Sequence, residues 1–224
     1  QSLSSDHIKD VKVETSGGSI TVASVNAGEE KIEIYVRPSN WTGSISSLSK
    51  DEIKQRLEEL YIMSVSTDNG KLTAIAKNKN WDMNWKKSLS ISFKIYVAKD
   101  VSTDLKTSGG SINLANLRGN QKFATSGGSL TIDGLSGNID GNTSGGSIKV
   151  YNSSDNIDLS TSGGSIEAKN CKGEMKLSTS GGSLKLLDLD GKISANTSGG
   201  SINGSNIHGE LNTGTSGGSV RLEG

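Results

Sequence analysis

The chain is poor in the residues from which globular cores are built. Of its 224 residues only 31% are hydrophobic and 4% aromatic, whereas 29 are glycine. This leaves too little apolar volume for a thick globular core. A net charge of zero, with 21% of the residues charged, argues against a disordered chain, which would repel itself. The composition therefore predicts an ordered protein with a thin, repetitive core.

Other absences exclude whole classes of function. Neutrality removes the basic surface expected of a nucleic-acid-binding protein. One cysteine, Cys171, excludes an internal disulfide framework and a thiolate metal cluster. No apolar run approaches ~18 residues, so no transmembrane segment is predicted. The chain begins at Gln1, which indicates either a mature product that has lost a signal peptide or an expressed fragment; we expect an exported protein.

What the sequence does contain is a repeat. The motif TSGGS, followed by Ile, Leu or Val, recurs at a constant interval of 18 residues. An eighth copy, at Thr15, precedes the array by 92 residues and is out of phase. Constant spacing without insertions indicates units that stack rigidly. The seven regular copies begin at Thr107, Thr125, Thr143, Thr161, Thr179, Thr197 and Thr215.

Each unit has the apolar pattern of short β-strands. Counting the Thr as position one, apolar residues recur at positions six, eight, eleven, fifteen and seventeen. Steps of two residues are typical of strands with one buried face, and tandem glycines would interrupt a helix. Each unit is therefore predicted to be one coil of a parallel β-solenoid, with residues 18 apart paired in adjacent strands ~4.8 Å apart.

Glycine and charge support this prediction. We expect the glycine pair of TSGGS to form a corner with positive φ, and position thirteen, Gly in most units and Asp155 in the third, to form another. Outward charges 18 residues apart mostly alternate in sign, as in Lys149, Glu167 and Lys185. Asp140 above Asp158 is the exception.

Residues 1–106 differ from the array at 107–224 and are predicted to form a β-rich capping part, continuous with a solenoid of seven TSGGS coils. A helix near 49–61 is signalled by the Ser49 and Glu52 capping box, with an apolar stripe that ends at Tyr61. This part would cover the exposed core at the end of the solenoid. Strands are expected at 11–15, 20–24, 31–37, 61–66, 71–76 and 90–97.

The order of these elements resembles a known family. The stretches VKVETSGGSITV, EEKIEIYVR, TDNGKLTAIAK and SISFKIYVAKDVSTDLKTSGG, together with the helix, are similar to the bacterial putative-adhesin family of β-strand-repeat domains over essentially the whole chain. The resemblance implies a right-handed parallel β-helix on a cell-surface, periplasmic or secreted protein. It implies no catalytic residues.

The TSGGS motif is interpreted as architecture. Its serines lack a base, because the chain has only His7 and His208. No Lys follows the glycines as in a phosphate-binding loop, and no Asp stands beside them as in calcium-binding repeats. No cofactor or metal site is predicted. Cys171 occupies a core column and is expected to be inert.

The sequence leaves several functions open. The first hypothesis is a non-enzymatic, adhesin-like or cell-envelope protein that presents a rigid polar face to a glycan or a cell-surface protein. The second is a polysaccharide-active enzyme that uses the stacked carboxylates of Asp140 and Asp158, at a spacing that suits a retaining glycosidase. The third is an ice-binding surface built from the Thr column. Trp81 and Trp85 would either stack on sugars or pack across the end of the solenoid, and Trp41 is expected to be part of the cap or exposed.

Overall fold

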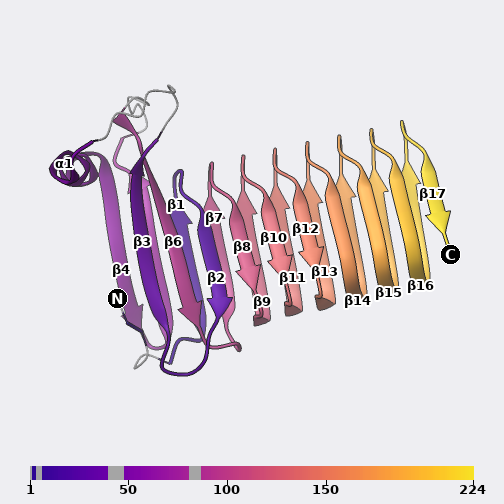
Figure 1. The fold of residues 1–224 in the computed structure, drawn as a ribbon, viewed down its shortest axis with the longest axis horizontal. Helices are drawn as coiled ribbons and strands as arrows, with labels where there is room; N and C mark the ends of the chain where they lie inside the picture. The colour runs from indigo at the N-terminus through magenta and orange to yellow at the C-terminus, as the bar shows by residue number, and fades with distance from the viewer. Residues whose placement is uncertain (1, 4–6, 40–47, 81–86) are drawn as a thin grey trace.

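The computed structural model describes residues 2–3, 7–39, 48–80 and 87–224. The strands of this part form one 17-stranded sheet that winds into an elongated solenoid, with a helix at the N-terminal end (Figure 1). The predicted all-β solenoid with 18-residue coils is confirmed. The elements before the array are β1 (Asp10–Thr15), β2 (Ile20–Ser24), β3 (Lys31–Pro38), α1 (Lys50–Leu60), β4 (Tyr61–Asp68), β5 (Lys71–Asn78) and β6 (Leu89–Val97).

Up to β13 the array alternates short strands, which follow TSGGS, with longer strands that lead into the next copy. From β14 to β16 the two are joined into one strand of 14 residues in each coil. Residues 18 apart are neighbours in adjacent parallel strands, as predicted: Ile148 pairs with Leu130 on one side and with Ile166 on the other. The strands are β7 (Ser102–Thr107), β8 (Ile112–Ala115), β9 (Arg118–Thr125), β10 (Leu130–Asp133), β11 (Ser136–Thr143), β12 (Ile148–Tyr151), β13 (Ser154–Thr161), β14 (Ile166–Thr179), β15 (Leu184–Thr197), β16 (Ile202–Thr215) and β17 (Val220–Glu223).

The out-of-phase TSGGS copy belongs to the same stack. β1 lies between β5 and β7, and its Thr15 is paired with Thr107. β2 lies between β6 and β8, and its Ile20 is paired with Ile112. The first coil is therefore interrupted after β2 by the segment from β3 to β6, and the stack resumes at β7.

This inserted segment forms the end of the solenoid. β3 pairs antiparallel with β6, and β4 pairs antiparallel with β5, so the parallel stack ends at both strands. α1 lies at the same end (Figure 1). The predicted capping box is confirmed: the Glu52 amide donates to Ser49 Oγ at 3.2 Å, and the Ser49 amide donates to Glu52 Oε2 at 2.8 Å.

The helix ends before Tyr61, so the prediction that Tyr61 belongs to the helical stripe is wrong, whereas the predicted strand that begins at Tyr61 is confirmed. Tyr61 is the first residue of β4 and is only 4% exposed. Its hydroxyl donates to the Leu89 carbonyl at 3.1 Å and accepts from the Leu89 amide at 2.7 Å. Leu57 and Leu60 are partly buried against the core. Tyr61 lies in the sheet because its ring is buried there while Leu89, the first residue of β6, forms hydrogen bonds with its hydroxyl.

The core consists of the predicted inward columns, including two polar residues. Ser153 Oγ donates to the Tyr151 carbonyl at 2.7 Å, and Gln121 Nε2 donates to the Val101 carbonyl at 2.7 Å. Hydrogen bonds offset the cost of burying these groups. Away from the C-terminal end the apolar members are at most 2% exposed, as shown by Leu117, Leu130, Ile132, Leu135, Ile139, Val150, Ile157, Cys171 and Met175. In the last strand the same columns are open to solvent, with Val220 44% and Leu222 51% exposed.

The tandem glycines form a corner for a reason that differs from the prediction. None of the TSGGS glycines has a positive φ, so that part of the prediction is wrong. Instead, the second glycine packs directly on the backbone of the neighbouring coil. A Cβ atom at Gly128 would collide with the carbonyl oxygen of Gly110, whereas one at Gly127 would be 3.7 Å from its nearest neighbour. Close approach of two backbones requires glycine here.

Left-handed backbone occurs at two other corners of the coil. The corner at position thirteen is confirmed, with φ of +111° at Gly173 and +81° at Asp155. The corner at position ten was not predicted. Its residues tolerate positive φ because they are glycine or carry short polar side chains; they are Asn116, Gly134, Asn152, Asn170, Asp188 and Asn206.

Candidate binding face

The threonine of TSGGS lies inside the corner. Thr125 is 5% exposed, and its Oγ1 donates to the Gly110 carbonyl at 2.8 Å and accepts from the Gly128 amide at 3.3 Å. The other coils repeat these two bonds, as at Thr161. Because the hydroxyls are buried and already bonded, the column presents no outward row. The hypothesis of an ice-binding surface built from the Thr column is therefore wrong.

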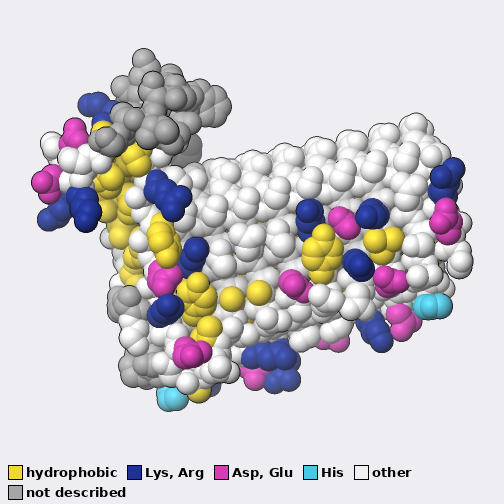
Figure 2. Space-filling view, viewed as in Figure 1, with side chains coloured by type: hydrophobic (Ala, Val, Ile, Leu, Met, Phe, Trp, Pro, Cys, Tyr) yellow, Lys and Arg dark blue, Asp and Glu magenta, His cyan; other side chains and the backbone are white. Residues whose placement is uncertain are grey.

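The last serine of each motif forms a ladder along the rod. The Ser129 amide donates to Ser111 Oγ at 3.2 Å, and the Ser147 amide donates to Ser129 Oγ at 3.3 Å. The second residue of each motif, also serine, is exposed in every copy of the array. In Figure 2 the upper part of the rod, where these corners lie, shows neither charged nor hydrophobic side chains. The corners therefore form a long uncharged surface.

Beside this surface, two rows of polar side chains flank the buried Thr column. They line a shallow hollow of about 560 Å³ and are here called the Ser–Asn face: Asn142, Ser144, Ser160, Ser162, Ser178, Ser180, Asn196 and Ser198. Each row repeats every ~4.8 Å along the rod, and the rows are two residues, ~7 Å, apart. Within the described part of the chain, only Asn196 uses its side chain in a hydrogen bond, to Ser194 Oγ at 3.3 Å. The other hydroxyls and amides are free to bind a partner.

The two stacked carboxylates are neighbours, as predicted. Asp140 pairs with Asp158, and Lys122 and Lys176 stand beside them in the same column. Asp158 forms an ion pair with Lys176 at 3.6 Å, and its side chain is 56% exposed. The hollow above them, about 400 Å³, is shallow and has no aromatic residue in its described lining. The carboxylates therefore lie on an open, solvated surface.

The remaining candidates do not form a chemical site in the described part of the chain. Cys171 is fully buried, and burial raises the pKa of its thiol, which disfavours the reactive thiolate. His208 lies beside Asp190 on the exposed side of β16 and β15. Among the described residues, no acidic, His and Cys side chains gather as a metal site would need, and no helix is long and apolar enough to cross a membrane. Trp41, Trp81 and Trp85 lie outside the described residues.

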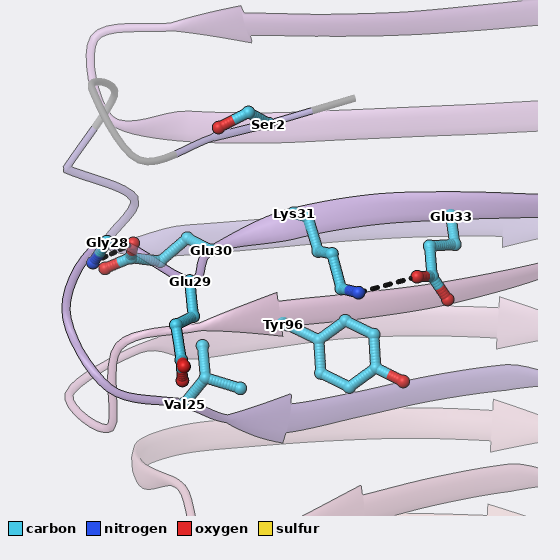
Figure 3. A pocket seen from close by; sticks show the side chains of 8 residues that line it. All are labelled: Ser2, Val25, Gly28, Glu29, Glu30, Lys31, Glu33 and Tyr96. Atoms are coloured by element: carbon cyan, nitrogen blue, oxygen red, sulfur yellow. Dashed lines mark hydrogen bonds and ion pairs between the residues drawn. The ribbon is translucent and has the colours of Figure 1, made fainter.

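The capped end carries a cluster of aromatic and charged residues that the sequence analysis did not single out. Lys31 Nζ lies 5.1 Å from the ring centre of Tyr96 and 2.8 Å from Glu33 Oε1 (Figure 3). The Tyr35 hydroxyl donates to Glu33 Oε2 at 2.9 Å. These hydrogen bonds, first the one from Lys31, lower the pKa of Glu33. The alternation of inward apolar residues with outward residues in KIEIYVR and SISFKIYV could have indicated that these side chains share one outer face.

Two solved structures are similar to the chain. A putative adhesin from Bacteroides fragilis has 14% sequence identity, with 97% of this chain and 93% of that chain covered and a TM-score of 0.38. A putative cell adhesion protein from Clostridium sporogenes has 9% identity, with 99% and 95% covered and a TM-score of 0.34. No protein-family model and no curated protein matches the chain.

Proposed function

We propose that the protein is a non-enzymatic, adhesin-like or cell-envelope interaction protein that acts outside the cytoplasm. In this proposal the solenoid is a rigid support for the Ser–Asn face, which binds a glycan or a cell-surface protein. One observation carries the proposal: two parallel rows of exposed or half-buried hydroxyl and amide groups, almost all without a partner in the described part of the chain.

Physical reasons favour binding over catalysis at this face. Its groups are held in a regular array by the hydrogen-bonded stack, so little order must be imposed when a partner binds. Hydroxyl and amide groups both donate and accept, which suits sugar hydroxyls or a peptide backbone. The face contains no titratable group, so it supplies no general acid, general base or ionisable nucleophile of its own.

The test is a glycan and cell-surface-protein array probed with two matched variants. The first replaces Ser160, Ser162, Ser178 and Ser180 with alanine and removes four hydroxyls from the face. The second replaces Ser136 and Ser154, which point outward on another side of the coil. We expect the first to weaken binding at least tenfold and the second to leave it unchanged. Equal loss in both variants, or no binding by the unaltered protein, would contradict the proposal.

The alternative is a polysaccharide-active enzyme with Asp140 and Asp158 at its centre. The observation in its favour is that the two carboxylates are neighbours below a shallow hollow. Asp140→Asn keeps the shape of the side chain and removes its charge. If wild-type protein cleaves a polysaccharide and this variant does not, the alternative replaces our proposal.

A further inference from the structure

Two tyrosines stand at the ends of one outward row on the short strands. Tyr96 of β6 pairs with Ala23 of β2, which pairs with Ala115 of β8. Ala115 pairs with Asp133 of β10, which pairs with Tyr151 of β12. We call these five residues the tyrosine tract. Its tyrosines are four strand spacings, ~19 Å, apart along the rod.

The tract has a low floor between its two aromatic ends. Ala23 and Ala115 extend only a methyl group from the sheet, whereas each tyrosine projects a ring, and all four are half-buried. Figure 2 shows small hydrophobic side chains in line between larger ones across the front of the rod. Next to the floor runs a row of uncharged polar residues, Thr21, Asn113 and Thr131, each two residues from its tract neighbour on the same strand.

Both tyrosine rings are partly enclosed by their neighbours. Lys31 lies over the ring of Tyr96 and is itself fixed by Glu33 (Figure 3). At the other end Tyr151 is half-buried, and burial and then the neighbouring Glu167 carboxylate raise the pKa of its phenol. Partly buried rings lose less side-chain freedom than exposed ones when a ligand stacks on them.

The chemistry of the tract points to sugar. The apolar C–H face of a pyranose stacks on an aromatic ring, and its hydroxyls bond to hydroxyl and amide groups. Thr21, Asn113 and Thr131 use none of their side-chain groups in hydrogen bonds within the described part of the chain. The single charge of the tract, on Asp133, already accepts from Asn152 Nδ2 at 2.7 Å. The polar row ends in Lys94 beside Tyr96 and Lys149 beside Tyr151, and each lysine is paired in register with a glutamate, Glu33 or Glu167. The charges at the two ends are therefore balanced within the protein, which favours an uncharged ligand.

The spacing of the strands indicates an extended ligand. One sugar residue in an extended β-linked chain is close in length to one strand spacing, so successive sugars would meet successive coils. We propose that the tyrosine tract binds an extended, uncharged, β-linked polysaccharide lengthwise along the rod, with one sugar stacked on Tyr96 and another on Tyr151. The tract lies on a different side of the coil from the Ser–Asn face, and the two proposals stand or fall separately.

The experiment is a calorimetric titration with β-1,4-linked glucose oligosaccharides of two lengths. Spanning both tyrosines takes about five sugars at one sugar per strand, so cellohexaose reaches both rings and cellotriose reaches one. We expect cellohexaose to bind at least tenfold more tightly than cellotriose. Tyr96→Ala and Tyr151→Ala should each remove this difference, whereas Tyr96→Phe and Tyr151→Phe, which keep the ring, should retain it.

A blocking variant separates a tract from two independent rings. Ala115→Glu places a long charged side chain on the floor and should weaken cellohexaose binding at least tenfold, with little effect on cellotriose. Leu187→Glu is the matched control, because Leu187 lies in the same row beyond Tyr151, and it should bind as the wild type. Equal affinity for both lengths, no detectable binding of either, or unimpaired binding by Ala115→Glu in folded protein would overturn the proposal. Four-serine variants of the Ser–Asn face should bind cellohexaose normally.

Discussion

The first coil and the coils of the array have the same TSGGS corner, but the carbonyl that accepts the threonine hydrogen bond comes from different segments of the chain. In the array, Thr125 Oγ1 donates to the carbonyl of Gly110, in the preceding TSGGS copy. In the first coil, Thr15 Oγ1 donates at 2.7 Å to the carbonyl of Ile91, in the cap strand β6. A cap strand without the motif therefore takes the place of a coil. The corner therefore requires a neighbouring parallel strand with a carbonyl in the right position, and this strand need not belong to the preceding TSGGS copy.

The largest expected effect comes from the second glycine of the motif. A Cβ at Gly128 would collide with the Gly110 carbonyl, and one at Gly18 with the Ile91 carbonyl. Both Gly128→Ala and Gly18→Ala should lower the free energy of unfolding by about 3 kcal/mol or more, measured by chemical denaturation. Gly127→Ala, where the nearest atom is 3.7 Å away, should cost less than about 1 kcal/mol. Tolerance of Gly18→Ala alone would show that the first coil is packed differently.

The buried threonines come next. Thr161→Val keeps the shape of the side chain but removes the partly buried 2.8 Å bond to the Gly146 carbonyl and the bond from the Gly164 amide. Thr15→Val does the same at the Ile91 carbonyl. Each should lower the free energy of unfolding by about 2 kcal/mol. The control is Ser162→Ala on the exposed side, which should leave the melting temperature unchanged. A much smaller cost at Thr15 would separate the first coil from the array.

Glu14 makes the junction between cap and array sensitive to acid. Its carboxylate, on β1, contacts Lys77 of β5, and this hydrogen bond is the main cause of its lowered pKa. A carboxyl group whose pKa is lowered by folding stabilises the protein at pH values above its pKa in the unfolded chain, 4.5. This stabilisation is lost as the pH falls through the lower pKa of the folded state. Glu14→Gln should therefore cost ~1 kcal/mol at pH 7 and little at pH 3. Equal costs at both pH values would contradict this.

The smallest effect is expected from the outward charge ladders. Lys185 and Glu167 are 3.4 Å apart, but the Lys185 side chain is 56% exposed. Lys185→Met should change the free energy of unfolding by less than about 1 kcal/mol, and less still in high salt. A larger, salt-independent loss would mean that Lys185 contributes through packing.

The register of the array could be predicted because its interval never varies. Residues 18 apart can be neighbours in only one way when every coil has the same length, so the pairing of Asp140 with Asp158 followed directly. The role of the glycine pair could not be distinguished in this way. Positive φ and close backbone approach both require glycine, and only the structure shows which one applies. The corner at Asn152 and Asn170 was visible as a column of residues that tolerate positive φ, but its meaning was missed.

The tyrosine tract could not be predicted from the 18-residue repeat. Tyr151 falls inside the array, but Tyr96 is in a segment whose register follows from the pairing of β6 with β2. No constant interval connects the two residues, because the inserted cap changes the phase. The helix boundary failed for a related reason: Tyr61 continues the helical spacing in the sequence, but its hydroxyl bonds to Leu89 and places it in the sheet. Contacts between residues far apart in the sequence determine both the tyrosine tract and the end of the helix.

We propose that the repeats of this chain build a binding surface and not a reaction centre. The most direct measurement takes a polysaccharide whose binding on the array requires the Ser–Asn face, incubates it with wild-type protein and with Asp140→Asn, and follows the release of reducing ends. We predict no release above background by either protein, together with binding that the four-serine variant loses. Release by the wild type that disappears in Asp140→Asn would contradict the account.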